Sequence, residues 1–184
     1  MSMRRVLVPL AEGCEELEAV TVIDLLRRAG VEVVVAGLDS GPIRASRGVT
    51  LLADIGLDEA LSQDYDMVVL PGGGAGADRL DGDGRIRELL KKMANNERFT
   101  AAICAAPKVL ASAGILAGHT VTAYPGVLEA LPQRDFQLSA DAVVSDGKIV
   151  TSRGPGTAMD FALTLIEHLC GRERRDSVAV ALKR

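Results

Sequence analysis

The stretch that decides the fold is Thr100-Ala101-Ala102-Ile103-Cys104-Ala105-Ala106-Pro107. A short apolar run ends at Cys104, small residues flank the cysteine on both sides, and a segment with helical spacing follows. This pattern predicts a buried strand that turns sharply into a helix, with Cys104 at the corner. A nucleophile elbow of this kind needs small residues two positions before and two positions after the nucleophile, and Ala102 and Ala106 meet that need.

Two interpretations of Cys104 are open. The N-terminus of a helix favours negative charge, so a thiol at the corner would have a pKa below its usual ~8.5 and would react as a thiolate. The alternative is a buried cysteine that acts as a small hydrophobe at the end of a strand. The small flanking residues favour the reactive interpretation, and Cys104 is therefore the first candidate for catalysis.

Composition and net charge indicate a globular protein and bear on the partners that it can attract. The chain has 184 residues, of which 48% are hydrophobic and 25% charged, and this predicts one globular domain over residues 1–184. A net charge of -4 gives no long-range attraction for nucleic acid or for an anionic membrane, so we expect neither as a partner.

Cysteine usage and the absence of targeting signals predict a cytoplasmic location. Cys14, Cys104 and Cys170 are odd in number and far apart, which is typical of a reducing compartment rather than of a disulfide framework. The N-terminal residues lack the apolar core of a signal peptide, and no window approaches the ~20 apolar residues of a membrane span.

Strand and helix patterns alternate along most of the chain. Short apolar strands are expected at 6–10, 31–36, 67–70, 101–103 and 120–123, helices at 15–29, 86–94, 108–113 and 161–170, and hairpins at 43–53 and 142–152. Residues 176–183 form either a last helix or a tail. Buried strands separated by helices predict a three-layer α/β sandwich with a mostly parallel sheet, which binds its ligands beyond the carboxyl ends of the strands.

Glu18 lies on the first expected helix, on the same face as the apolar Val22 and Leu25. That face should pack on the sheet, and burial would raise the pKa of the carboxyl group. A protonated Glu18 near Cys104 would donate a hydrogen bond to a thiolate or transfer protons in catalysis. The alternative is that Glu18, like Glu15 and Glu16, only complements the helix dipole, and the helix register leaves both open.

The run Pro71-Gly72-Gly73-Gly74-Ala75-Gly76-Ala77 formally matches a dinucleotide-binding fingerprint. The helix that should begin within the motif is interrupted by the glycines at 82 and 84, and the expected acidic residue is missing. We therefore predict a loop, in which the N–H groups of Gly73 and Cys104 form an oxyanion hole. His119 and His168 are interpreted as surface or packing residues, and no spacing indicates a metal site or a cofactor.

Four motifs together resemble the ThiJ/PfpI superfamily: Ala101–Pro107, Leu70–Gly73, Glu15–Glu18 and Thr151–Thr157. Within it the chain resembles the Parkinson-disease protein deglycase branch, and most closely the bacterial YajL proteins. The resemblance covers nearly the whole chain. It implies one class I glutamine amidotransferase-like domain with a flavodoxin-like sandwich, a homodimer, and a reactive cysteine on a strained elbow.

The resemblance also implies roles for single residues. Cys104 is then the nucleophile and the peroxide-sensitive thiol, and Glu18 the protonated carboxyl beside it. Gly72, Gly73 and Ala105 border the oxyanion and substrate site, Arg47 reaches the site of the partner subunit, and Arg28 and Arg153 line the same region.

The activity implied is a cofactor-independent conversion of reactive dicarbonyls or their protein adducts, with methylglyoxal giving lactate. The alternative is a non-catalytic redox sensor and chaperone.

Two departures from the family pattern matter. Ala105 stands where the superfamily's peptidases have a histidine, so peptidase chemistry is not expected. Tyr124 stands where the human branch has a histidine, and because tyrosine does not exchange protons near neutral pH, we expect weak glyoxalase activity.

Overall fold

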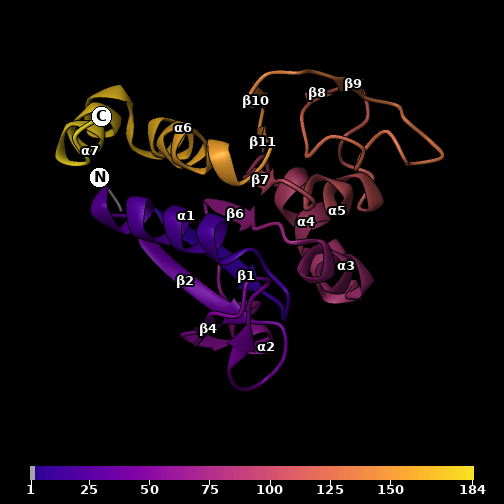
Figure 1. The fold of residues 1–184 in the computed structure, drawn as a ribbon, viewed down its shortest axis with the longest axis horizontal. Coiled ribbons are helices and arrows are strands. Elements are labelled where there is room, and N and C mark those ends of the chain that lie inside the picture. Colours follow the sequence, from indigo (N-terminus) through magenta and orange to yellow (C-terminus); the bar gives the residue numbers. More distant parts are fainter. Residues whose placement is uncertain (1–2) are drawn as a thin grey trace.

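The computed structural model describes residues 3–184 (Figure 1). Seven strands form one sheet, in the order β10-β11-β7-β6-β1-β2-β5. Every neighbouring pair is parallel except β10 with β11. The predicted α/β sandwich with a mostly parallel sheet is therefore confirmed. The strands of this sheet are β1 (Arg5–Leu10), β2 (Glu32–Gly37), β5 (Ile55–Gly56), β6 (Met67–Leu70), β7 (Phe99–Ile103), β10 (Val143–Asp146) and β11 (Ile149–Ser152).

Helices cover both faces of the sheet. On one face lie α1 (Glu16–Arg28), α6 (Ala158–Cys170) and α7 (Arg172–Ala181), and on the other lie α2 (Leu57–Ala60), α3 (Gly74–Gly82), α4 (Gly84–Asn95) and α5 (Pro107–Ser112). Successive side chains of a strand point to opposite faces, so Val6 and Val8 of β1 join the core under α1 and α6, while Leu7 joins the core under α4 and α5. None of the helices in residues 3–184 is both long and apolar enough to cross a bilayer.

The two expected hairpins are confirmed. β3 (Ile43–Arg44) pairs antiparallel with β4 (Thr50–Leu51), and β10 pairs antiparallel with β11 through a turn at Gly147, whose φ is 59°. The segment between β7 and β10 carries one further small pair, β8 (Thr120–Val121) with β9 (Gln137–Leu138). Residues 176–183 were expected to form either a last helix or a tail, and those up to Ala181 belong to the helix α7.

The loop predicted for the glycine run is wrong beyond Gly73. The chain turns at Gly73 (φ 86°), and α3 begins at the next residue. Gly76 lies so close to the backbone of Cys14 that a Cβ atom there would come within 2.6 Å of the Cys14 nitrogen. The glycine therefore permits close packing of a helix and does not signal an irregular loop. Asp83 ends α3 and caps α4 by accepting a hydrogen bond from the Arg85 N–H at 2.8 Å.

Candidate active site

The sharp turn after β7 holds Cys104 in a left-handed backbone conformation, with φ 64°. This conformation costs a non-glycine residue on the order of 1–3 kcal/mol, and it persists only where the surroundings fix it. The N–H of Cys104 donates to the Ser152 carbonyl oxygen at 2.9 Å, and the N–H of Tyr124 donates to the Cys104 carbonyl oxygen at 2.9 Å. The predicted nucleophile elbow is present, and two neighbouring segments clamp it.

Glu18 lies beneath this elbow with no exposed surface. Its Oε2 accepts the N–H of Gly72 at 2.8 Å, its carboxyl group hydrogen-bonds with the Cys104 thiol, and its Oε1 has no partner. Burial is the main cause that raises the pKa of Glu18 to about 7, against the smaller opposing effect of the two hydrogen bonds. Near neutral pH, Glu18 is therefore able both to hold and to release a proton.

The lowered thiol pKa expected from the sequence is wrong for Cys104 beside an ionised Glu18. Burial, followed by the charge of Glu18 and the hydrogen bond to it, raises the pKa of the thiol to about 12. The helix after the elbow has six residues and begins at Pro107, too short and too distant to outweigh these effects. When Glu18 takes the proton, its repulsion disappears, whereas the hydrogen bonds from Gly73 and Ala105 to the sulfur remain. Thiolate formation at Cys104 is thus tied to the protonation of Glu18.

The oxyanion site also differs from the expectation. The Cys104 N–H is occupied by Ser152, so it is not free to bind a substrate oxygen. The N–H groups of Gly73 and Ala105 instead act on the Cys104 sulfur as hydrogen-bond donors that lower the pKa of the thiol, and they are the donors that we assign to the site. Gly72 packs directly behind them, because a Cβ atom there would lie 2.6 Å from both the Cys104 Cβ and the Glu18 Oε2.

A second carboxylate, which the sequence analysis did not distinguish from a dipole partner, organises the loop between β3 and β4. Glu16 accepts hydrogen bonds from the N–H groups of Arg47 at 3.0 Å and Val49 at 3.4 Å and from the Ser46 hydroxyl at 3.1 Å. Burial acts to raise the pKa of Glu16, but these bonds and that of its own N–H outweigh burial and lower it. Arg47 is held through its backbone, and its exposed side chain makes no ion pair within residues 3–184.

Tyr124 is fixed beside the elbow by its backbone, while its side chain is 51% exposed. Its ring lies over Gly154, where a Cβ atom would be 3.2 Å from the ring. The ring forms one wall of a cavity of about 370 Å³, which is lined by Tyr124, Pro125, Ala142, Arg153, Gly154, Pro155, Gly156 and Thr157. Within one chain Arg153 therefore lies near the elbow, whereas Arg28 lies at the opposite end of α1 from Glu18 and pairs with Asp24 at 2.6 Å.

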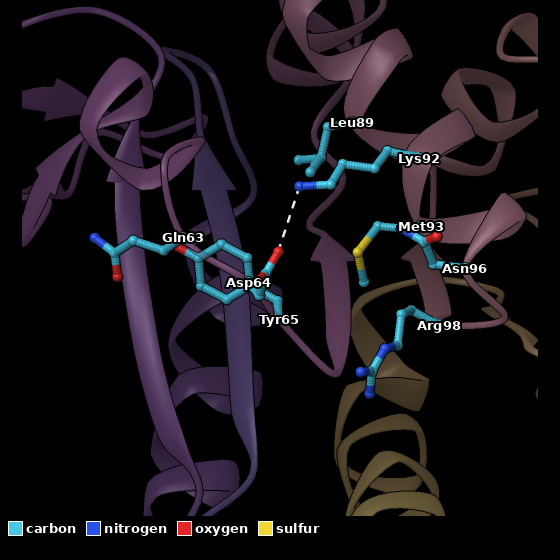
Figure 2. A pocket seen from close by; sticks show the side chains of 8 residues that line it. All are labelled: Gln63, Asp64, Tyr65, Leu89, Lys92, Met93, Asn96 and Arg98. Atoms are coloured by element: carbon cyan, nitrogen blue, oxygen red, sulfur yellow. Dashed lines mark hydrogen bonds and ion pairs between the residues drawn. The ribbon is translucent and has the colours of Figure 1, made fainter.

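A different cavity, of about 360 Å³, lies between α4 and the segment before β6 (Figure 2). An ion pair between Lys92 Nζ and Asp64 Oδ1, 3.4 Å apart, spans it. Arg98, which also lines it, directly precedes β7, whereas Cys104 follows the other end of that strand. The cavity therefore lies at the amino ends of the strands, away from the elbow.

Both histidines also lie toward the amino end of β7, in agreement with the predicted packing or surface roles. His168 contacts Ser145 at 3.0 Å and its ring lies 5.1 Å from that of Phe99, the first residue of β7. His119 lies 3.4 Å from Asp146. Neither supplies a base to Cys104.

Comparisons with known proteins agree with this geometry. The model of the DJ-1/PfpI family matches residues 4–168. The Parkinson disease protein 7 homolog of Danio rerio is 44% identical over 94% of this chain and 93% of its own length, and the glutathione-independent glyoxalase DJR-1.2 of Caenorhabditis elegans is 34% identical over 91% and 89%. The crystal structure of Drosophila melanogaster DJ-1beta covers 98% of both chains at 42% identity with a TM-score of 0.94. With its cysteine elbow and buried glutamate, the chain belongs to the DJ-1/PfpI family.

Proposed function

We propose that the protein is a cysteine-dependent, cofactor-independent enzyme that acts on reactive dicarbonyls or their protein adducts and converts methylglyoxal to lactate. One observation carries the proposal: Cys104 sits on a left-handed elbow in hydrogen-bond contact with a fully buried Glu18 whose pKa is near 7. The name of the Caenorhabditis elegans relative, a glutathione-independent glyoxalase, supports the same class of reaction.

The proposed reaction begins when the proton of the thiol passes to Glu18 and the Cys104 sulfur attacks the aldehyde carbon of methylglyoxal. The new C–S bond leaves negative charge on the former aldehyde oxygen, where the N–H groups of Gly73 and Ala105 stabilise it until the proton on Glu18 is transferred to it. The Glu18 carboxylate then removes the hydrogen of that carbon as a proton and returns it to the neighbouring carbon. The hydroxyl proton passes from the former aldehyde oxygen to the former ketone oxygen, which gives a lactoyl thioester. Water cleaves the thioester, releasing lactate and the Cys104 thiol, so the net change is the addition of one water.

A non-catalytic redox sensor and chaperone is the second candidate. The observation in its favour is the buried Glu18 Oε1, which has no hydrogen-bond partner and belongs to the group that contacts Cys104. If peroxide oxidises Cys104 to the sulfinate, a protonated Glu18 would donate a hydrogen bond to it and stabilise that state. In this case the oxidised protein, and not turnover, would be the functional form.

A lactate assay with methylglyoxal in the absence of glutathione separates the two functions. We expect multiple turnovers by the reduced wild type, none by Cys104→Ala, and loss of turnover after peroxide treatment. Cys170→Ala is the matched control, because Cys170 is also a free cysteine but is exposed at the end of α6. Turnover by Cys104→Ala would refute the cysteine-dependent mechanism, absence of turnover by the reduced wild type would refute the enzyme, and protection of client proteins that survives in Cys104→Ala would support the chaperone.

We further propose a homodimer in which Arg47 approaches the partner's Cys104 site. Exposed apolar side chains lie near the contact between Glu16 and the β3–β4 loop: Leu17 and Val20 on α1, and Val49 and Leu52 on either side of β4. Burying them between two copies would be favourable, and it would bring the exposed Arg47 to the interface. The same proposal includes a single domain over residues 1–184, a bacterial YajL-type branch, a cytoplasmic location, and no nucleic-acid or membrane partner.

A further inference from the structure

Arg153 is the residue after β11, and it lines two cavities at once. One is the cavity of about 370 Å³ walled by Tyr124 and Pro155, and the other, of about 270 Å³, includes Glu129. Pro125 is the second residue that both cavities share. The two neighbouring cavities together form a groove, and Arg153 lies where they meet, close to the elbow.

The guanidinium of Arg153 has no carboxylate within ion-pair distance among residues 3–184. Its one hydrogen bond runs from Nη1 to the Ala140 carbonyl oxygen at 3.1 Å, which holds the side chain across the groove and leaves most of its N–H donors free. Arg153 is also the only charged residue that lines the 370 Å³ cavity, whose other walls include Pro155 and Ala142. A small, mostly apolar cavity with one unpaired arginine is complementary to a carboxylate on a short carbon skeleton.

Two residues that line this cavity, Arg153 and Tyr124, are connected to Cys104 through backbone hydrogen bonds. Arg153 directly follows Ser152, whose carbonyl oxygen accepts the Cys104 N–H, and Tyr124 donates its N–H to the Cys104 carbonyl oxygen. The Ser152 hydroxyl lies 2.6 Å from the Thr157 hydroxyl, and this contact fixes the loop that carries Pro155. A group bound here would therefore lie on the side of the elbow that Tyr124 and Arg153 flank.

We infer that the Arg153 cavity binds a carboxylate carried by the thiol-derived or peptide-derived part of the substrate, so that acidic adducts of dicarbonyls are preferred over neutral ones. This inference rests on the proposed function for its reaction, in which the Cys104 sulfur displaces the carrier thiol or amine from the former aldehyde carbon and the leaving group takes the proton held by Glu18. The binding of the carboxylate does not depend on turnover. Arg153 is then a specificity-determining residue that takes no part in the chemistry.

Two matched substrates test the preference: the methylglyoxal hemithioacetals of N-acetylcysteine and of N-acetylcysteine amide, which differ in one negative charge. Arg153→Gln should raise KM for the acid about tenfold, leave its kcat nearly unchanged, and leave both constants unchanged for the amide. Arg153→Lys should restore part of the loss. Arg134→Gln is the control, because Arg134 is exposed on the same part of the chain and lines neither cavity.

A binding measurement separates this inference from the proposed function. Titration of ¹⁵N-labelled Cys104→Ala protein with N-acetylalanine should shift the Arg153 Nε–H and Gly154 N–H signals, and N-acetylalanine amide should not. If wild type turns over neither adduct while these shifts occur, the proposed function fails and the carboxylate site stands. Equal effects of Arg153→Gln on the acid and the amide, or equal shifts with the two ligands, would overturn the inference.

Discussion

Glu18 is a carboxyl group whose ionisation opposes folding. Its pKa rises from 4.5 to about 7, so between these pH values the folded chain binds more protons than the unfolded chain, and the free energy of unfolding falls as the pH rises. The stabilising contribution is complete below pH 4.5 and is lost above pH 7, a change of about 3 kcal/mol. The pH dependence of stability therefore carries a signature of this one residue.

Glu18→Gln removes that signature. We expect the difference in unfolding free energy between Glu18→Gln and wild type to grow by about 3 kcal/mol in favour of the variant from pH 4.5 to pH 7. Urea unfolding at a series of pH values measures it, and taking the difference cancels groups common to both proteins, such as Glu16. A difference that stays constant with pH would show that Glu18 is ionised at its ordinary pKa in the fold.

Tyr124 tests the proton path of the proposed enzyme. Its phenol is half exposed and its link to the elbow is a backbone hydrogen bond, so Tyr124→Phe should change the rate of lactate formation less than twofold. Tyr124→His should raise the rate, because a histidine exchanges protons near neutral pH. Glu18→Gln should nearly abolish turnover while the fold is retained. A Tyr124→Phe variant as inactive as Glu18→Gln would assign the phenol a direct role.

Single residues show where reasoning from sequence succeeds and where it ends. The place of Cys104 at the elbow was predictable because the small-residue corner is a local pattern, whereas the helical stripe left two interpretations of Glu18 open. The oxyanion donors were not fully predictable, because the Cys104 N–H is taken by Ser152, and that pairing follows from the placement of β11 beside β7. The thiol pKa required the distance between two groups that lie far apart in the sequence.

At the level of elements, the turn between β6 and α3 tolerates a side chain at one glycine and not at another. Gly72→Ala would force a Cβ atom to within 2.6 Å of Glu18 Oε2 and the Cys104 Cβ, so we expect a loss of about 1–3 kcal/mol in stability together with loss of activity. Gly74→Ala is the matched control, since nothing lies within 4 Å of its Cβ position and alanine favours a helix. Thermal unfolding of both variants measures the difference in stability. Equal melting temperatures would contradict the expected clash at Gly72.

Elements with strong periodicity were predicted within a few residues, as α1, β6 and the β10–β11 hairpin show. α3 was missed because its glycines serve close packing on Cys14, which is a tertiary demand that a local rule interprets as a loop. The role of Glu16 was missed for a related reason. Three acidic residues in one helical turn look alike in the sequence. Only the positions of the β3–β4 loop and of the turn between β6 and α3 assign each carboxylate its partner.

For the whole molecule, the proposed homodimer gives a direct measurement. Light scattering should yield about twice the chain mass of 19.3 kDa for wild type. Leu17→Glu combined with Val20→Glu should give the monomer, because charges would replace apolar side chains in the proposed interface. Val180→Glu, at a more exposed apolar position on α7, should leave the mass unchanged. A monomer mass for wild type at all concentrations would refute the dimer.

The sandwich architecture was predictable because buried strands that alternate with helices leave few other solutions. The order of the strands was not, since the pairing of β7 with β11 and of β1 with β6 depends on which faces the helices cover. That order brings β7, β6 and β1 side by side, and for this reason Cys104, Gly72 and Glu18 meet at one edge of the sheet.

The same strand order has a consequence for biosynthesis. β1 leaves the ribosome before the other strands but ends in the interior of the sheet between β2 and β6, and α1 packs against α6, which follows all the strands in the sequence. Until α6 emerges, the nascent chain displays the apolar stripe of α1 that includes Val22, Leu25 and Leu26. Such an intermediate is open to aggregation and is a natural client for a holdase chaperone. Translational pausing before residue 158 would prolong that exposure.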